Sequence, residues 1–247
     1  MRRCDAIVSN AHSVAQRIEQ RCGFPANRVR VIPNGVEVAS VNSCSEALAD
    51  ERLRLGIKAD DIVVISVGRL VPVKGYDLAI RALASLTDAQ RNYHLILVGD
   101  GPEAASLQSL SESLQIHERV HFVGHQQEVS RWLRSADIYV NTSHSEGMSQ
   151  SMVEALAMGC PIIATDVGDS AEVLGRPTEC GRLIPPGNVA AIASAVVELT
   201  NAHERELLGQ MASARHARLF SAAAMASSYE SLYVSIFEPI PARSLTP

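Results

Sequence analysis

The sequence predicts an α/β fold in which helices cover both faces of an open, doubly wound parallel sheet. Short apolar runs rich in β-branched residues alternate with segments of helical periodicity, and glycine-rich or polar turns separate them. This alternation is typical of βαβ units. The runs are nearly continuous in apolar character, as expected for parallel strands buried on both faces. Hydrophobic residues make up 47% of the 247 residues, enough to build a substantial core.

The predicted elements follow one another in a regular order. Strands are expected at 62–67, 95–98, 120–123, 138–140 and 162–165. Helices are expected at about 76–86, 103–114, 128–134, 149–158, 189–199, 204–220 and 222–237.

The first 60 residues do not share this rhythm. They predict a strand at 5–9, a helix at 13–22 and a strand from 29 that ends in a turn at 35, followed by a polar, irregular stretch over 38–60. We therefore expect residues 1–40 to belong to a preceding domain and its linker. Residues 41–220 should form the sheet domain, and residues 221–247 a terminal helix and tail. A first strand without an upstream neighbour would leave an unpaired edge.

Composition excludes several classes of protein. With 22 Lys and Arg against 27 Asp and Glu, the net charge of −5 gives no general attraction to nucleic acid. The five cysteines are scattered without a CxxC pair, which argues against a zinc site or a disulfide framework. No apolar run approaches the roughly 20 residues that span a bilayer. The expected location is the cytoplasm, with peripheral contact to the inner membrane face left open.

The loop after the first sheet strand carries two cations. It reads Gly68-Arg-Leu-Val-Pro-Val-Lys-Gly75 and places Arg69 and Lys74 five residues apart. Ligands of open parallel sheets bind at the carboxyl ends of the strands, so both side chains can converge on one anion. A bidentate guanidinium and a point-charge ammonium together suit a diphosphate. The alternative is two solvated surface cations, and the spacing is not that of a Walker loop.

The next turn contains Gly99 and Gly101, which would let a ligand approach the backbone. The alternative is a tight turn between strand and helix. Ala104 stands where a dinucleotide-binding GxGxxG motif needs glycine, so that reading is weakly supported. His125 follows the third strand and reads more readily as a polar loop residue than as a catalyst.

The sharpest pattern joins two carboxylates, Glu146 and Glu154, eight positions apart across the start of a predicted helix. On an ideal helix they would lie about 80° apart and could reach one ligand. Backbone N–H groups of residues 147–151 would point at an anion there, and carboxylates accept hydrogen bonds from sugar hydroxyls. The alternative is an acidic first turn that favours the helix dipole, with Glu154 merely exposed.

The motifs in this order resemble the retaining glycosyltransferases of the GT-B fold that carry an E-x7-E motif (glycosyl transferases group 1, family four). The chain is similar to their C-terminal, donor-binding half, a Rossmann-like domain. The matching segments are VIPNGVE (31–37), VGRLVPVKGYDLAIRAL (67–83), LILVGDGP (95–102), VHFVGH (120–125), ADIYVNTSHSEGMSQSMVEALAMGCPIIATDVGDSAEVL (136–174) and GRLIPPGN (181–188).

The resemblance implies a role for each matching residue. Arg69 and Lys74 would hold the donor diphosphate and stabilise the leaving nucleotide, and Glu146 would face the donor sugar. Cations placed in advance can do the work of a metal, so no metal or other cofactor is implied. The remaining residues implied in substrate binding are Gly68, Gly99, Gly101, His125, Gly147, Met148, Ser149 and Glu154.

The substrates implied are a nucleoside diphosphate sugar and a hydroxyl acceptor on a glycan, a lipid or a small molecule. Two departures from the family stand out. Asp169 replaces the second of two glycines that usually follow this strand. The acceptor domain is also missing, or is a separate chain, so we expect exposed apolar surface and self-association. Two further hypotheses are a non-catalytic nucleotide-sugar-binding subunit and, with less support, a GT-B nucleotide-sugar epimerase.

Overall fold

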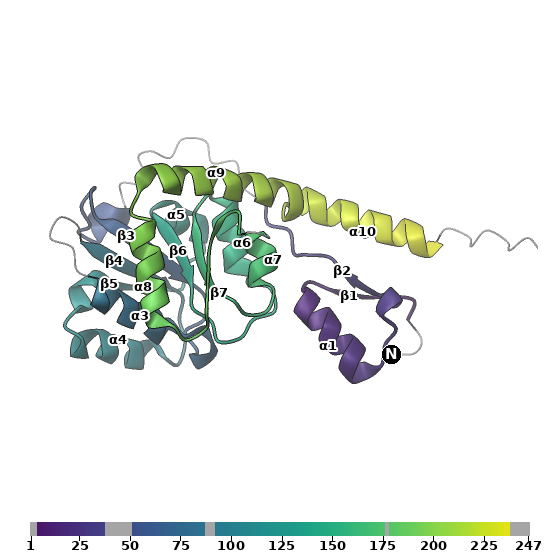
Figure 1. The fold of residues 1–247 in the computed structure, drawn as a ribbon, viewed down its shortest axis with the longest axis horizontal. Coiled ribbons are helices and arrows are strands. Elements are labelled where there is room, and N and C mark those ends of the chain that lie inside the picture. The colour runs from purple at the N-terminus through teal and green to yellow at the C-terminus, as the bar shows by residue number, and fades with distance from the viewer. Residues whose placement is uncertain (1–3, 38–50, 87–91, 176–177, 238–247) are drawn as a thin grey trace, which may run out of the picture.

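The computed structural model describes residues 4–37, 51–86, 92–175 and 178–237. Its main body is a six-stranded sheet in the order β5-β4-β3-β6-β7-β8, and every neighbouring pair is parallel. The strands are β3 (Ile62–Val67), β4 (Tyr93–Val98), β5 (Val120–Gly124), β6 (Ile138–Asn141), β7 (Ile162–Thr165) and β8 (Gly181–Ile184). Helices flank the sheet (Figure 1). The predicted doubly wound α/β fold is therefore confirmed.

Two helical layers bury the two faces of this sheet. The helices α3 (Tyr76–Ser85), α4 (Ala104–Ser113) and α8 (Val189–Glu198) contribute to one apolar cluster. The helices α5 (Val129–Arg134), α6 (Gln150–Ala157), α7 (Ser170–Leu174) and α9 (Ala202–Leu219) contribute to the other. Within β3, Val64 packs into the first cluster while Val63 and Ile65 pack into the second. This alternation explains why the strand is apolar at every position.

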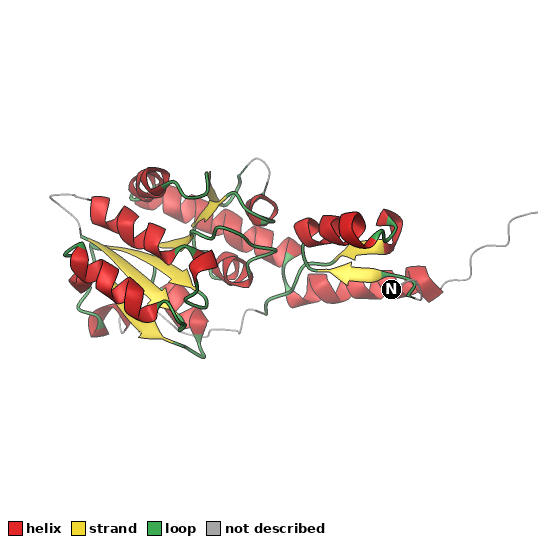
Figure 2. Ribbon diagram, turned by 90° about the horizontal axis from the view of Figure 1, so that it is seen from below, coloured by secondary structure: helices red, strands yellow, loops and turns green. Residues whose placement is uncertain are grey.

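Residues 4–37 form a separate small unit. The strands β1 (Ile7–Ser9) and β2 (Val29–Val31) pair in parallel, with α1 (His12–Cys22) and the 3-10 turn η1 (Ala26–Arg28) between them. Figure 2 shows this second sheet apart from the main one. The opening strand thus pairs on one edge with a downstream strand, β2. Among the described residues its other edge has no partner strand, as expected.

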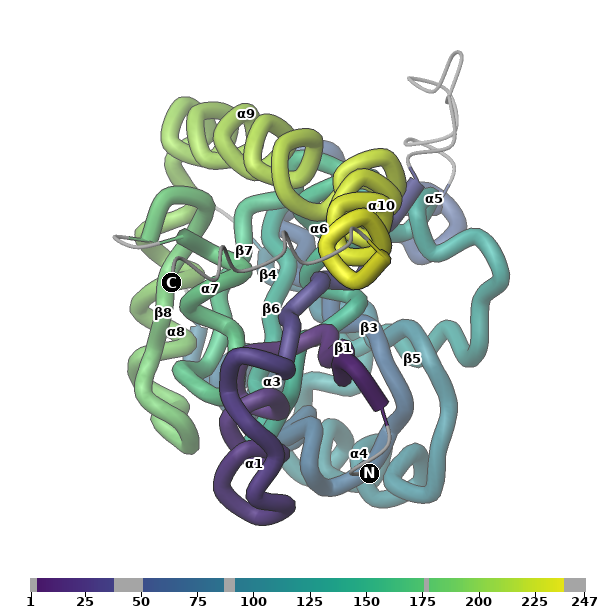
Figure 3. Tube along the Cα trace, turned by 90° about the vertical axis from the view of Figure 1, so that its right-hand side faces the viewer, coloured from purple at the N-terminus to yellow at the C-terminus, as the bar shows by residue number. Residues whose placement is uncertain are grey.

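The terminal helix α10 (Ala222–Phe237) follows α9 after a break and runs beside the small unit (Figure 1, Figure 3). At the break, Val36 N donates to Phe220 O over 2.8 Å. Gly35 lies so close that a Cβ there would be 2.7 Å from Ala222 Cα. The outer part of α10 exposes Tyr233 and Phe237 by 56% and 78%. The expected exposed apolar surface is confirmed for this helix.

Of the strands and α-helices whose bounds are given above, β8 and α7 were not predicted. Arg182 interrupts the apolar run of β8, and α7 has only five residues. Residues 51–54 are helical, which corrects the expectation of an irregular stretch up to residue 60. The domain boundary between residues 40 and 41, Cys44 and the tail from 238 lie outside the described residues, and the proposed domain division stays a prediction. No helix in the described parts of the chain is both long and apolar enough to span a membrane.

Candidate functional site

The sheet reverses its direction of growth at β3. The chain continues from β3 through β4 to β5 on one side, and then returns to place β6 on the other side of β3. Open α/β sheets bind ligands outside the carboxyl ends of the strands at such a switch point. The loops that leave β3 and β6 carry three of the predicted site residues, namely Arg69, Lys74 and Glu146. The topology therefore brings them to one edge of the sheet.

Lys74 and Glu146 contact each other directly across the switch point. Lys74 Nζ forms an ion pair with Glu146 Oε1, which also accepts a hydrogen bond of 2.8 Å from Ser143 Oγ. The Lys74 and Glu146 side chains are only 24% and 12% exposed. The sequence predicted that both would face a ligand, whereas the structure shows them paired to one another.

Backbone contacts hold these two loops together. Lys74 closes the 3-10 turn η2 (Pro72–Lys74), and Gly75 follows in the left-handed region with φ 62°. A Cβ at Gly75 would lie 2.4 Å from the carbonyl oxygen of Thr142. The hydroxyl of Thr142 donates to Gly75 O over 2.8 Å. Glycine at 75 is thus required both by φ and by the close approach of the second loop.

Arg69 differs from Lys74 in its surroundings. Its side chain is exposed and forms no ion pair with another described residue. Since Glu146 balances the charge of Lys74, Arg69 is the uncompensated positive charge on this loop. It can attract an anion without first breaking an ion pair.

The glycines after β3 and β4 pack against one another. A Cβ at Gly99 would lie 2.0 Å from Gly68 O, and one at Gly101 would lie 2.3 Å from Leu70 O. Their φ angles of 135° and 159° also favour glycine. Contact between loops is enough to explain these glycines, so their predicted role in ligand binding has no separate support here.

Tyr76 and Ser143 complete the site, and the sequence reasoning missed both. Tyr76 begins α3, is 3% exposed, and its hydroxyl would lie 2.8 Å from a Cβ at Gly68. Burial, together with the negative charge of Glu146, raises the pKa of Tyr76, so its hydroxyl stays protonated. Their positions in the sequence could have indicated that both lie near the site, because Tyr76 directly follows Gly75 and Ser143 precedes Glu146 by three residues.

Glu154 lies on α6, whereas Glu146 lies in the loop before that helix. The predicted 80° separation around one helix axis is therefore wrong as a description of this pair. Glu154 is half-buried, and this burial raises the pKa of its carboxyl group. Ser149 is the N-cap residue of α6 and its side chain caps no backbone N–H in this structure.

Gly147 and Met148 lie between the sheet domain and the small N-terminal unit. A Cβ at Gly147 would lie 3.3 Å from a methyl carbon of Val14 on α1. Met148 lines a pocket of about 440 Å³ between α9, α10 and this unit. His125 is exposed in the loop after β5, the edge strand. It follows Gly124, whose carbonyl oxygen accepts a hydrogen bond of 2.8 Å from Gly99 N.

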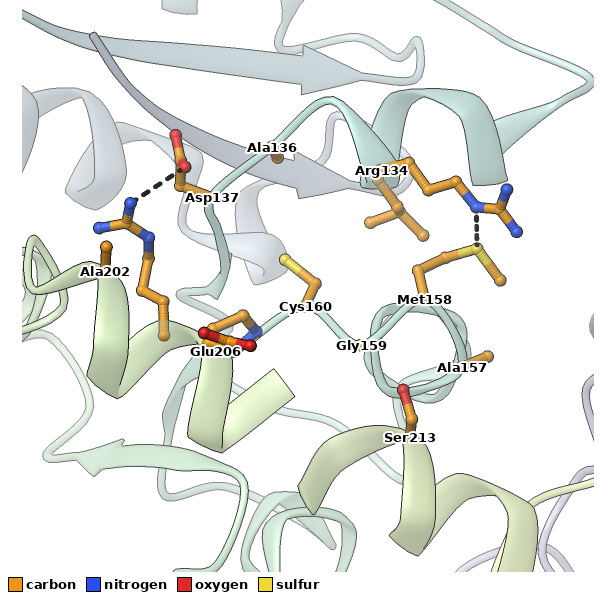
Figure 4. Close-up of a pocket in the computed structure, with 13 residues that line it drawn as sticks. Arg134, Ala136, Asp137, Ala157, Met158, Gly159, Cys160, Ala202, Glu206 and Ser213 are labelled. Carbon is orange, nitrogen blue, oxygen red and sulfur yellow. Dashed lines mark hydrogen bonds and ion pairs between the residues drawn. The ribbon is translucent and has the colours of Figure 1, made fainter. Parts of the chain in front are cut away.

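A second pocket, of about 530 Å³, lies at the opposite edge of the sheet (Figure 4). Asp137 and Pro161, which line it, directly precede β6 and β7, so it faces the amino ends of those strands. Arg205 Nη2 lies 3.4 Å from Asp137 Oδ1 there. Burial raises the pKa of the Cys160 thiol, which favours its protonated form. None of the predicted site residues lines this pocket.

In the parts of the chain that the structure describes, no three His, Cys, Asp or Glu side chains gather as ligands for a metal ion. The described site offers instead two cations and a carboxylate. Its chemistry is that of binding an anion beside a hydrogen-bond acceptor.

Comparison with known proteins gives two family matches. Residues 49–214 match the family Glycosyl transferases group 1, and residues 1–40 match Glycosyltransferase Family 4. The lipopolysaccharide core biosynthesis glycosyltransferase LpsE of Rhizobium meliloti is 30% identical over 237 residues, which cover 95% of this chain and 65% of LpsE. A D-inositol 3-phosphate glycosyltransferase of Acidothermus cellulolyticus is 32% identical over 207 residues, or 79% of this chain and 45% of that protein.

Solved structures agree on the fold. The crystal structure of Anabaena HepE in complex with UDP matches with a TM-score of 0.86 at 24% identity, covering 95% of this chain and 65% of HepE. Sucrose-phosphate synthase from Thermosynechococcus elongatus matches with a TM-score of 0.81 at 26% identity, covering 95% and 59% of the two chains. The chain spans about half the length of several curated relatives that it matches. Because the group 1 match covers most of the sequence, the chain belongs to the Glycosyl transferases group 1 family.

Proposed function

We propose that this chain binds a nucleoside diphosphate sugar at the β3–β6 switch point, as the donor-binding half of a retaining glycosyltransferase. The observation that carries the proposal is that the loops bearing Arg69, Lys74 and Glu146 lie at one edge of the sheet, where Lys74 and Glu146 form an ion pair. Cations suit the diphosphate and a carboxylate suits the sugar hydroxyls. Membership of the glycosyl transferase family supports the same assignment.

In the proposed reaction, the bond between the anomeric carbon and the diphosphate oxygen breaks. The acceptor oxygen forms its new bond on the same face of the sugar, and its proton passes to the departing diphosphate oxygen. Arg69 and Lys74 stabilise the negative charge that develops on the departing diphosphate, which is why the proposal needs no metal ion. Lys74 would exchange part of its contact with Glu146 for contact with the diphosphate, and Glu146 would then be free to face the sugar.

The two carboxylates of the E-x7-E motif would bind different parts of the donor, with Glu146 facing the sugar. Glu154 would accept hydrogen bonds from the ribose hydroxyls, and its partial burial strengthens such bonds. The backbone of Gly147, Met148 and Ser149 would contact the sugar and phosphate at the start of α6. Gly68, Gly99 and Gly101 would admit the ligand to the backbone, and His125 would lie near the base.

The acceptor would be bound by a domain that precedes the sheet domain, in a longer protein or in a separate chain. The exposed face of α10 offers that domain apolar surface, or else a second copy of this chain. We place the reaction in the cytoplasm, since nucleotide sugars with a glycan or lipid acceptor fit an enzyme at the inner membrane face. The UDP and UDP-glucose in the HepE structures make uridine nucleotides the first probes.

The test is a calorimetric titration of the 247-residue chain with UDP, GDP and ADP. We expect one nucleotide to bind, and the double variant Arg69→Ala/Lys74→Ala to abolish that binding. The matched control is Lys58→Ala/Arg81→Ala, which removes the same two charge types from exposed positions away from the switch point. Equal binding by the site variant and the control variant would contradict the proposed site.

A further inference from the structure

Asp169 stands where the resemblance leads one to expect glycine, and the structure gives its carboxylate two partners far away in the sequence. Oδ1 accepts a hydrogen bond of 2.9 Å from the backbone N–H of Ser13, and Oδ2 accepts one from the N–H of His12. These are the first two residues of α1. Asp169 therefore caps a helix of the N-terminal unit from the sheet domain.

This cap is unusual because it comes from a residue far away in the sequence. The N-cap residue of α1 is Ala11, whose methyl group cannot accept a hydrogen bond, and the first turn holds no acidic residue. Asp169 is only 3% exposed and forms no ion pair with any described cation. The amides and the positive end of the α1 dipole are thus what balance its buried charge.

The backbone of Asp169 contacts a different segment, the loop that carries Glu146. Asp169 N donates to Gly147 O over 2.8 Å. A Cβ at the preceding Gly168 would lie 2.4 Å from Glu146 O and 2.5 Å from Gly147 O, so the two loops are in backbone contact. Gly147 in turn faces Val14 of α1, as described above.

We propose that Asp169 is a positioning residue that couples the donor loop, residues 145–149, to the first turn of α1; the proposal rests on the function proposed above. Its carboxylate holds α1 and its N–H holds Gly147, so one residue fixes the spacing between the two units at the point where Glu146 meets the ligand. A glycine at 169 could keep the second contact but not the first.

The first test is amide hydrogen exchange on the full chain, comparing Asp169→Asn and Asp169→Gly with the parent. Loss of the charged cap should speed exchange in the first turn of α1 roughly tenfold, while the core strands β3 and β4 keep their protection. The matched control is Asp166→Asn, an exposed aspartate three residues earlier in the same turn. Unchanged exchange in α1 would overturn the proposal.

The second test separates positioning from mere stability. UDP and UDP-glucose are titrated into each variant by calorimetry. We expect the affinity for UDP to stay within about twofold, since the diphosphate cations lie on another loop, and the ratio of UDP-glucose to UDP affinity to fall several-fold. Faster exchange with an unchanged ratio would refute the positioning role. If the parent chain binds neither nucleotide, the proposed function fails, and the exchange rates alone then uphold or refute the coupling.

Discussion

The ion pair between Lys74 and Glu146 leads to a counterintuitive prediction about Glu146→Gln. In the structure Glu146 holds the ammonium group that the diphosphate is proposed to need. Glutamine keeps the shape of the side chain and an oxygen for the Ser143 hydroxyl, but it removes the negative charge. We therefore expect the variant to bind UDP more tightly than the parent chain and to transfer sugar more slowly.

The size of the effect follows from the burial of the pair. At 24% and 12% exposure, Lys74 and Glu146 are screened less than a surface pair, yet both still touch solvent. Breaking such a pair costs about 1 kcal/mol. If the ligand no longer has to break it, UDP should bind about fivefold more tightly.

The assay is a calorimetric titration of UDP into the parent, Glu146→Gln and the control Glu112→Gln, at low and high salt. Glu112 is exposed on α4 and forms no ion pair with another described residue, so the control changes net charge without touching Lys74. The gain in affinity should shrink at high salt. Weaker binding of UDP by Glu146→Gln would refute the idea that Glu146 restrains Lys74 before the ligand arrives.

Three further predictions concern stability and association. Burial, and the nearby charge of His94, lower the pKa of His121 from 6.5 to about 4. The folded chain thus disfavours its protonation, and urea titrations should show that His121 contributes a loss of at most about 3 kcal/mol as the pH falls from 6.5 to 4. The loss should be smaller in His121→Phe but not absent, because burial also lowers the pKa of His94. Gly181→Ala should destabilise the chain by about 3 kcal/mol or prevent folding, because its Cβ would lie 1.8 Å from Ile162 O, and a urea midpoint equal to the parent's would contradict this. Phe237→Ser should reduce self-association in light scattering, whereas an unchanged mass at every concentration would show that α10 is not the contact.

The sequence was sufficient to predict the sheet because its strands are short and fully buried. Every residue of β3 and β4 is buried, and such continuous apolar runs have few other interpretations. The exposed or interrupted elements were harder. Arg182 interrupts the apolar pattern of β8, so the sequence alone does not indicate a strand there. The strand is recognised in the structure from its pairing with β7, where Gly181 lies against Ile162.

The candidate site was predicted in its parts but not in its contacts. Position after a strand was enough to single out Arg69, Lys74 and Glu146, since the carboxyl ends of parallel strands share one edge. The pairing of Lys74 with Glu146 spans 72 positions, and the bond from Asp169 to Ser13 spans 156. No local pattern encodes contacts over such separations, because they depend on how the folded units pack.

The crossing at Val36 and Phe220 has a consequence for how the two units can move. The chain passes between them twice, once near Val36 and once where α9 ends and α10 begins, and a backbone hydrogen bond joins the two passages. Two connecting segments that are joined at one point act as a single hinge, which permits rotation of the two units but resists their separation. Any rotation of the N-terminal unit against the sheet domain should therefore occur about this point. A side chain added at Gly35 would clash with Ala222 and obstruct that rotation.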